Sequence, residues 1–220
     1  DLVRSRGLGD VYKRQLQLQL VVYMDAAMEM LRGQHPKKEI LPGGILYYHI
    51  DDPVLESDTP LSDEEAEQAL LFALRPDGLV NSGEEIYRAM DQNFEGKSQM
   101  IPVEIKKNGE ISTARSKVAS TEEFAVITRY VEHEIRQCGE AIYAGNIAVN
   151  PYRSDIETSC TYCPYASVCG MDAKIPGYEY RQFASMKKEE VLDQMQTELA
   201  RNRGKEERSD EMDEGTAERH

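Results

Sequence analysis

Three closely spaced cysteines are the residues of this chain best suited to bind a metal. Cys160 and Cys163 stand in C-x-x-C spacing, and Cys169 follows in the same short segment. A C-x-x-C pair places two thiolates on one tight turn, and a further short turn brings the third within reach of the same centre. Thiolates select zinc or iron–sulfur clusters. The spacing therefore predicts a soft-metal site and disfavours three unrelated buried thiols.

Such a site needs a fourth ligand, and the chain contains one other cysteine, Cys138. Cys138 follows apolar positions at helical spacing, so a buried free thiol is the simpler interpretation of its surroundings. It also remains a rival for the fourth ligand position. Clustered cysteines of this kind are typical of a reducing compartment, and they favour the cytoplasm over a disulfide-stabilised secreted scaffold.

Composition sets the broad class of the protein. The chain has 220 residues, 40% of them hydrophobic, which suffices for one domain with appendages. No apolar run approaches the length of a membrane span, and no signal peptide is recognisable. The formal net charge of −14 argues against bulk attraction to nucleic acid. A nuclease stays possible, because a local basic groove can lie on an acidic body.

Periodicity and turn residues predict a mixed α/β fold. Helices are expected at 16–31, 61–74, 82–94 and 187–200. Another should begin at Ser120, carry Cys138 and end before Gly145, with Gly139 as a point where it could be interrupted. Gly33 and Pro36 should end the first helix, and Ser62 with Glu65 has the spacing of a capping box at the start of the second. The helix after Ser120 should bury a periodic set of side chains, namely Phe124, Ile127, Tyr130, Val131, Ile135 and Cys138.

Shorter apolar runs predict the strands. They are expected at 45–50, 101–105, 111–112 and 147–149. The first should be buried on both faces. The second and third should pair as a hairpin around Asn108 and Gly109, which have the sequence of a type I′ turn. Pro76-Asp77-Gly78 is interpreted as the stop after the second helix.

The two ends of the chain are expected to lie outside the folded domain. Residues 1–15 have no apolar period and resemble translated adapter sequence, so we treat them as a non-native leader. Residues 16–175 should form the domain, with the cysteine loop at 160–169. Residues 176–220 should form a helix and then, from Arg201, a disordered charged tail.

Gln19 and Tyr23 stand one helical turn apart and so share a face of the first helix. Such a pair is most often an ordinary surface feature, and it gains meaning from its context. Q-x-x-x-Y on a helix, followed by C-x-x-C-P-Y-x-x-x-C, resembles the RecB-like branch of the PD-(D/E)XK nucleases. Segments 44–53 and 147–152 are similar to the B subunits of bacterial ATP-dependent helicase/deoxyribonucleases of the AddAB type. The resemblance extends over residues 16–172.

The resemblance implies a nuclease domain of a helicase-like subunit that processes broken DNA ends for recombination, together with an A subunit and ATP. In such domains an aspartate and a D/E-x-K pair lie on a hairpin before the glutamine–tyrosine helix, and they bind Mg²⁺. Gln19 and Tyr23 would support that site. The resemblance also implies a [4Fe–4S] cluster with Cys160, Cys163 and Cys169 as three ligands and a fourth that precedes the nuclease core.

The sequence departs from this pattern upstream of the first helix. Asp10 and Lys13 lie in the suspect leader, and their D-x-x-K spacing would turn the two side chains to opposite faces of a strand. We therefore expect the catalytic carboxylates to be missing and the chain to be an inactive C-terminal fragment of a longer subunit. His49, Asp51 and Asp52 are interpreted as a strand-end histidine and a turn.

Two other interpretations stay open. A zinc- or cluster-stabilised binding module without catalysis would carry the same cysteines, and its full gene would lack a D/E-x-K pair before the first helix. A stand-alone CRISPR-associated nuclease of the four-cysteine type would combine a similar core with a C-terminal cluster. The insertion between Asp51 and Ile147 weighs against that type.

Where a cluster is bound, Tyr162, Pro164 and Tyr165 should shield it from water.

Overall fold

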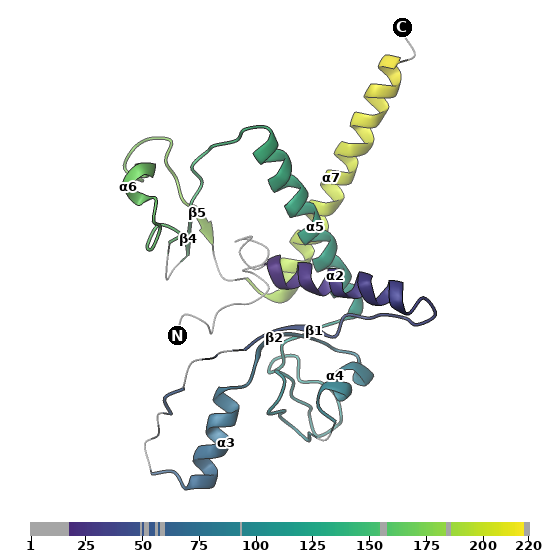
Figure 1. The fold of residues 1–220 in the computed structure, drawn as a ribbon, viewed down its shortest axis with the longest axis vertical. Coiled ribbons are helices and arrows are strands. Elements are labelled where there is room, and N and C mark those ends of the chain that lie inside the picture. The colour runs from purple at the N-terminus through teal and green to yellow at the C-terminus, as the bar shows by residue number, and fades with distance from the viewer. Residues whose placement is uncertain are drawn as a thin grey trace. The chain divides into compact units, whose positions relative to one another are not determined.

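The computed structural model of the chain describes residues 18–48, 50, 53–55, 57, 60–92, 94–154, 158–183 and 186–217, with backbone alone at 154, 183 and 203–217 (Figure 1). The helices are α2 (Leu18–Gln34), α3 (Asp63–Ala73), α4 (Glu84–Met90), α5 (Thr121–Tyr143), α6 (Ala166–Cys169) and α7 (Lys188–Ala217). The strands are β1 (Gly44–Tyr47), β2 (Asp77–Asn81), β3 (Val118–Ala119), β4 (Tyr152–Ser154) and β5 (Arg181–Phe183). The mixed α/β content is as predicted. None of the described helices combines the length and apolar character that a membrane crossing requires.

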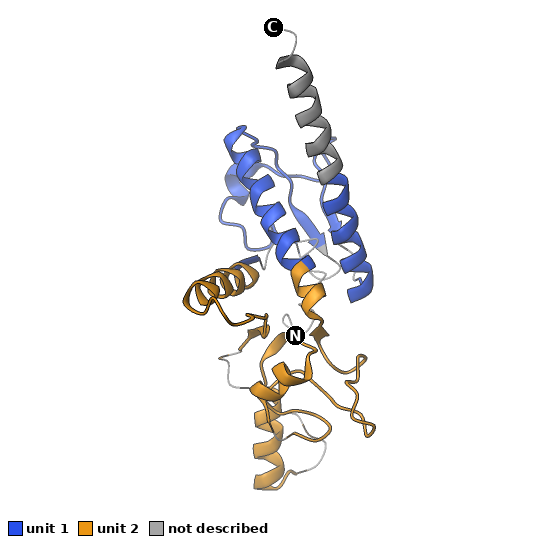
Figure 2. Ribbon diagram, turned by 90° about the vertical axis from the view of Figure 1, so that its right-hand side faces the viewer, with its two compact units in different colours: residues 1–19, 126–220 blue, residues 20–125 orange. Residues whose placement is uncertain are grey.

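The chain divides into two compact units, which Figure 2 distinguishes by colour. Unit 2 comprises residues 20–125, and unit 1 contains the described parts of 1–19 and 126–220. Unit 1 buries one side of α5 and one side of α7, where Val191 and Met195 are fully buried. A hydrogen bond of 2.7 Å between Asn202 Nδ2 and His133 Nε2 joins these two helices.

Unit 2 is built on a three-stranded sheet with the order β1-β2-β3. β1 is antiparallel to β2, with Leu46 opposite Gly78, and β2 is parallel to β3, with Val80 opposite Val118. The apolar core gathers around the central strand and consists of Val80, Tyr87, Phe94, Ile101, Val103, Ile105 and Val118, with Leu46 and Ile111 packed against it.

β1 is shorter and more exposed than the sequence predicts. The strand ends at Tyr47, and beyond it Tyr48 is 62% and Ile50 is 93% exposed. Among the described residues β1 pairs with β2 alone, so it is an edge strand whose residues are only partly buried. The prediction of a strand at 45–50 that is buried on both faces is therefore wrong in length and in burial.

β2 was not expected, because Asp77 and Gly78 have the composition of a turn. Gly78 has a φ of +144°, which side chains of L residues rarely adopt, and the backbone of β1 approaches it closely. A Cβ atom at Gly78 would overlap the carbonyl oxygen of Ile45 and would lie 2.9 Å from Leu46 Cα. Glycine is needed at this position because the backbones of β1 and β2 lie too close together for a side chain. Pro76-Asp77-Gly78, which we interpreted as a helix stop, therefore leads directly into a strand.

The predicted hairpin exists, with a different turn. Ile105 and Ile111 form an antiparallel bridge, and the N–H of Gly109 donates to the carbonyl of Lys106 at 2.9 Å. This bond places Asn108 and Gly109 at the third and fourth positions of the turn, whereas a type I′ turn needs them at the central pair. Gly109 has a φ of +85°, as in hairpins in which a turn is followed by a left-handed glycine.

α5 runs without interruption from Thr121 to Tyr143 and has most of its predicted buried face. Four of the expected residues are at most 2% exposed, namely Phe124, Ile127, Tyr130 and Val131. The prediction is wrong for Ile135, which is 45% exposed, and for Cys138, which is exposed. The exposure reaches 78% at Ile142 and 96% at Tyr143, so the last turns of the helix leave the core.

The ends of three helices differ from the sequence-based expectation. α2 passes through Gly33 and ends at Gln34, two residues before Pro36. Because Gly33 keeps a helical conformation, the proline, which cannot continue a helix, is the effective stop. α4 ends at Met90, earlier than the predicted residue 94. α7 continues to Ala217, beyond Arg201, where we expected disorder to begin.

The predicted capping box at the start of α3 is confirmed. Ser62 Oγ accepts the N–H of Glu65 at 3.3 Å, and Glu65 Oε2 accepts the N–H of Ser62 at 2.9 Å. The backbone hydrogen bond, and after it the side-chain hydrogen bond, lowers the pKa of the Glu65 carboxyl. A lowered pKa in the folded state means that this contribution to stability is present above the ordinary carboxyl pKa and is lost as the pH falls through the lowered value.

We expect Ser62→Ala to lower the free energy of unfolding of unit 2 by about 1 kcal/mol at neutral pH, because one helix N–H loses its acceptor. At pH values below the lowered pKa of Glu65 the difference should shrink, since the reciprocal bond is already weakened in the wild type. Urea denaturation at the two pH values measures this. Thr113→Ala, which removes an exposed hydroxyl from a turn of the same unit, is the control. An effect of Ser62→Ala that equals the control would contradict the capping role.

Candidate functional site

Gln19 and Tyr23 lie one turn apart near the beginning of α2. Both side chains are exposed, Tyr23 by 59%. Val21, between them in sequence, is 1% exposed and marks the opposite, buried side of the helix. The helix therefore presents the pair together on one exposed face, as its spacing predicts.

The cysteine loop begins at β4 and returns through β5. The two strands run parallel, with Tyr152 opposite Arg181. Where the loop leaves β4, the N–H of Tyr152 donates to Ser159 Oγ at 3.1 Å, and the N–H of Ser159 donates to the carbonyl of Tyr152 at 3.1 Å. The strand predicted at 147–149 is wrong, because Ile147 is 93% exposed and pairing starts only at Tyr152.

A tight turn and a single helical turn carry the three thiols. The N–H of Cys163 donates to the carbonyl of Cys160 at 3.3 Å and closes the C-x-x-C turn. Cys169 is the last residue of α6, and its N–H donates to the carbonyl of Tyr165 at 2.8 Å. Gly170 follows in the left-handed conformation, with a φ of +65°, and ends the helix. This is the local structure that the cysteine spacing predicts.

The donor set suits a soft metal in chemical type. Cys160, Cys163 and Cys169 are unpaired thiols that are partly buried, whereas Cys138 is exposed on α5, which corrects the expectation of a buried thiol there. Within the described part of the chain, no three histidine, cysteine or acidic side chains form a group that could hold a metal ion. Metal binding would therefore have to draw the sulfur atoms together, which couples binding to the local folding of the loop.

The apolar side chains of the loop face solvent. Tyr162 is 91%, Tyr165 is 70% and Val168 is 84% exposed. The expectation that Tyr162, Pro164 and Tyr165 shield a bound cluster from water stays a prediction. Removing the hydroxyl of one exposed tyrosine should change the free energy of unfolding little, which makes Tyr162 a useful control position.

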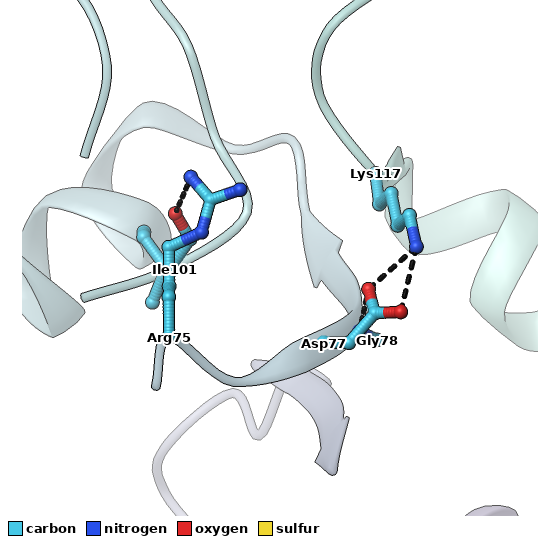
Figure 3. A network of polar contacts seen from close by, with 5 residues as sticks. All are labelled: Arg75, Asp77, Gly78, Ile101 and Lys117. Atoms are coloured by element: carbon cyan, nitrogen blue, oxygen red, sulfur yellow. Dashed lines mark hydrogen bonds and ion pairs between the residues drawn. The ribbon is translucent and has the colours of Figure 1, made fainter. Parts of the chain in front are cut away.

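Unit 2 carries a separate polar network around Asp77 (Figure 3). Lys117 Nζ lies 2.6 and 2.7 Å from the two carboxylate oxygens of Asp77, and the N–H of Gly78 donates to the same carboxylate at 2.8 Å. Arg75 Nη1 donates to the carbonyl of Ile101 at 3.4 Å. Burial lowers the pKa of Arg75, and nearby carboxylates oppose that shift. The network ties β2 to the segment before β3 and to the adjoining loop.

Several positions interpreted from the sequence lie outside the residues that the structure describes. They are Asp10, His49, Asp51 and Asp52. The leader at 1–15 lies there too. The view that the leader is non-native, and that none of these side chains binds a metal, stays a prediction.

Comparison with known protein families decides the classification of the chain. Residues 4–170 match the PD-(D/E)XK nuclease superfamily. The chain belongs to the PD-(D/E)XK nuclease superfamily. The matched range includes the face of Gln19 and Tyr23 and all three cysteines of the loop. The mixed α/β content of the structure agrees with this nuclease fold.

Three relatives of this PD-(D/E)XK chain are each named as the B subunit of an ATP-dependent helicase/deoxyribonuclease. The relative from Thermoanaerobacter sp. (strain X514) is 38% identical over 184 residues, which are 84% of this chain and 16% of that protein. That from Lachnoclostridium phytofermentans is 40% identical over 185 residues, 80% of this chain and 16% of that protein. That from Clostridium botulinum (strain Langeland) is 38% identical over 197 residues, 90% of this chain and 17% of that protein. The chain thus spans about one sixth of the length of these relatives.

The letters of the superfamily motif also occur within unit 2. Pro76-Asp77 supplies P-D, and Glu104-Ile105-Lys106 supplies E-x-K. The resemblance places the motif before the glutamine–tyrosine helix, whereas these letters follow it. A search for the letters alone would have found it.

In the structure these residues form ion pairs. Asp77 is held by Lys117, and Glu104 Oε1 lies 2.8 Å from Arg115 Nη1. The ammonium of Lys106 lies on the exposed turn, 3.8 Å from a glutamate four residues on. Each carboxylate therefore has a cationic partner of its own within unit 2.

Proposed function

We propose that the chain is part of the B subunit of an ATP-dependent helicase/deoxyribonuclease that processes double-strand DNA ends for recombinational repair. The observation that carries this is the alignment of 80% to 90% of the chain with proteins of that name at 38% to 40% identity. Membership of a nuclease superfamily over residues 4–170 supports hydrolysis of DNA phosphodiesters as the reaction. The partners in this proposal are DNA and the A subunit, with ATP used by the complex.

In this proposal Mg²⁺ bound by carboxylates of the parent protein would polarise the phosphate and activate water. The described residues of this chain contribute positioning. Gln19 and Tyr23 carry no charge, lie on one exposed face of α2, and can hydrogen-bond a water molecule or a phosphate oxygen. Their role would be to hold the substrate in line, which requires no change in their own protonation.

The cysteine loop would hold a structural [4Fe–4S] cluster. Cys160, Cys163 and Cys169 supply three thiolates of the type such clusters use, and a fourth ligand would come from another part of the parent protein. Cys138 is the rival within this chain, in the same unit as the loop. The alternative for the whole site is zinc in a binding module without catalysis, and metal analysis distinguishes the two.

The full-length subunit, co-purified with its A subunit, should degrade linear duplex DNA in the presence of Mg²⁺ and ATP. The 220-residue chain alone should not cut DNA, because the catalytic carboxylates are expected upstream of α2. A full-length complex without nuclease activity would overturn the proposed function. DNA cleavage by the chain alone that is lost in Asp10→Ala would instead overturn our view of the leader.

Gln19→Ala in the full-length subunit should slow DNA cleavage by roughly 10- to 1000-fold, because a positioning hydrogen bond in a preorganised site is lost. Single-turnover cleavage of a DNA end measures the effect, and ATP-driven unwinding should stay near the wild-type rate. Gln34→Ala, at the exposed far end of the same helix, is the matched control. If both variants cut DNA at the wild-type rate, the pair has no role in the reaction.

A further inference from the structure

The buried stripe of α5 continues in the sequence beyond the point at which it is covered. Ile127 and Val131 lie on this stripe and are at most 1% exposed. Helical spacing carries the same face on to Ile135, Cys138 and Ile142. Ile135 is 45% and Ile142 is 78% exposed, and Cys138 is exposed as well. The last turns of α5 therefore present an apolar face to solvent within unit 1.

This face has the form that accepts a side chain of a second helix. Where two helices pack closely, a side chain of one enters a hole between four residues of the other, at positions i, i+3, i+4 and i+7. The exposed face supplies such a set in Ile135, Cys138, Gly139 and Ile142. The two middle residues are small, and a Cβ atom added to Gly139 would meet nothing within 4 Å beyond its own turn of the helix. A large apolar side chain would thus have room between the two isoleucines.

The end of α5 has a defined cap, so the backbone of the face is already fixed. The N–H of Gly145 donates to the carbonyl of Ile142 at 3.0 Å, and the N–H of Asn146 donates to the carbonyl of Ala141 at 2.9 Å. With Gly145 at a φ of +72°, these two bonds form a Schellman motif. A preformed surface of this kind loses little conformational entropy when a partner packs on it.

The residues at and after the end of α5 have the composition of an interface. Residues 141–152 contain no charged side chain, in a chain in which 30% of the residues are charged. Every residue from 142 to 150 is nevertheless exposed, with Tyr143 at 96% and Ile147 at 93%. The cores of protein interfaces are depleted in charged residues and enriched in aromatic ones. A continuous exposed stretch without charge therefore indicates contact with another apolar protein surface.

We propose that the face of Ile135, Cys138, Gly139 and Ile142 packs against an apolar helix from another part of the same subunit. The inference rests on the proposed function, which makes this chain part of a B subunit. The chain aligns with 16% to 17% of the length of the three relatives, so most of such a subunit is available to cover the face. Permanent interfaces are also more apolar than transient ones, which favours a partner in the same polypeptide.

Cys138 is a natural probe of this contact in the full-length subunit, purified without the A subunit. We expect N-ethylmaleimide to alkylate Cys138 at least about tenfold more slowly in the folded subunit than in urea, because the partner helix must first move away. Arg136→Cys is the matched control, since Arg136 lies on the exposed, polar side of the same helix. Its thiol should react at nearly the rate measured in urea. Peptide mass spectrometry reads the two positions separately.

Ile142→Glu should raise the alkylation rate of Cys138 toward that of Arg136→Cys, because it places a charge on the face that the partner covers. Arg136→Glu is the matched control and should leave the rate unchanged. If Ile142→Glu does not fold, the wild-type rate decides alone.

Cys138 that reacts in the folded wild type as fast as Arg136→Cys would overturn this inference, while the proposed function would still be tested by nuclease activity. Protection that appears only with the A subunit, or only at high protein concentration, would place another partner on the face and would overturn it too. Loss of iron in Cys138→Ala would show that metal ligation, not packing, slows the reaction. A protected Cys138 in a complex without nuclease activity would overturn the proposed function alone.

Discussion

Cys163→Ala in the full-length subunit should leave the purified protein almost without iron. A [4Fe–4S] cluster is held by four thiolates, so the wild type should contain about four iron atoms per chain. Cys163 belongs to the C-x-x-C turn, where its N–H already bonds the carbonyl of Cys160, and no other cysteine of the loop can replace it there. Because metal binding is coupled to folding, the thermal midpoint should fall as well. Iron analysis, visible absorption and a melting curve measure the three effects.

Cys138→Ala is the matched control, since it removes the other thiol of the chain from an exposed position on α5. We expect it to keep the wild-type iron content. Loss of the cluster in Cys138→Ala would identify Cys138 as the fourth ligand. One equivalent of zinc and no iron in the wild type would refute the cluster and favour the zinc-stabilised module.

Gly78→Ala should destabilise unit 2 by at least about 3 kcal/mol or prevent its folding. The new Cβ atom would overlap the carbonyl oxygen of Ile45, and the φ of +144° is unfavourable for alanine in any case. The sheet cannot relax locally, because β2 is the central strand and pairs on both sides. Urea denaturation of the chain, followed by circular dichroism, measures the change.

Gly33→Ala is the control in the same unit. Gly33 lies in the last turn of α2, with no atom within 4 Å of an added Cβ, so alanine should stabilise the helix by up to about 1 kcal/mol. We therefore expect Gly78→Ala to lower the free energy of unfolding and Gly33→Ala to raise it. Equal, small effects would show that the β1–β2 approach is looser than the structure describes.

Local patterns predicted the parts of the fold that depend on neighbouring residues. The capping box of Ser62 and Glu65 and the buried stripe at the start of α5 follow from spacing alone. The turn and short helix of the cysteine loop were predicted in the same way. These features need no information about the rest of the molecule, because three or four residues determine them.

Other parts of the fold depend on partners that are distant in the sequence. β2 was missed because Asp77 and Gly78 resemble a turn, and only the approach of β1 explains the glycine. β4 and β5 have three residues each and gain their pairing from each other. Cys138 is exposed because the residues that pack against the buried face of α5 do not extend as far as this position. Helical spacing in the sequence does not show where that packing stops.

The features of the candidate site likewise divide into those that short-range spacing predicts and those that depend on residues distant in the sequence. The face of Gln19 and Tyr23 and the three loop cysteines were found from their spacing. The arrangement of the thiols was not, because no three metal-binding side chains of the described residues form a group, and this depends on the packing of the loop and not on its spacing.

The parallel pairing of β4 and β5 has a consequence for the metal binding that we propose for the loop. The pairing already joins the two ends of the segment between Ser154 and Arg181, so the entropy of closing that loop is lost when the protein folds and not when the metal arrives. The thiols are thereby kept at a high effective concentration relative to one another. Loss of the metal would release the sulfur atoms without opening the base, and the same three ligands would remain in place to be filled again.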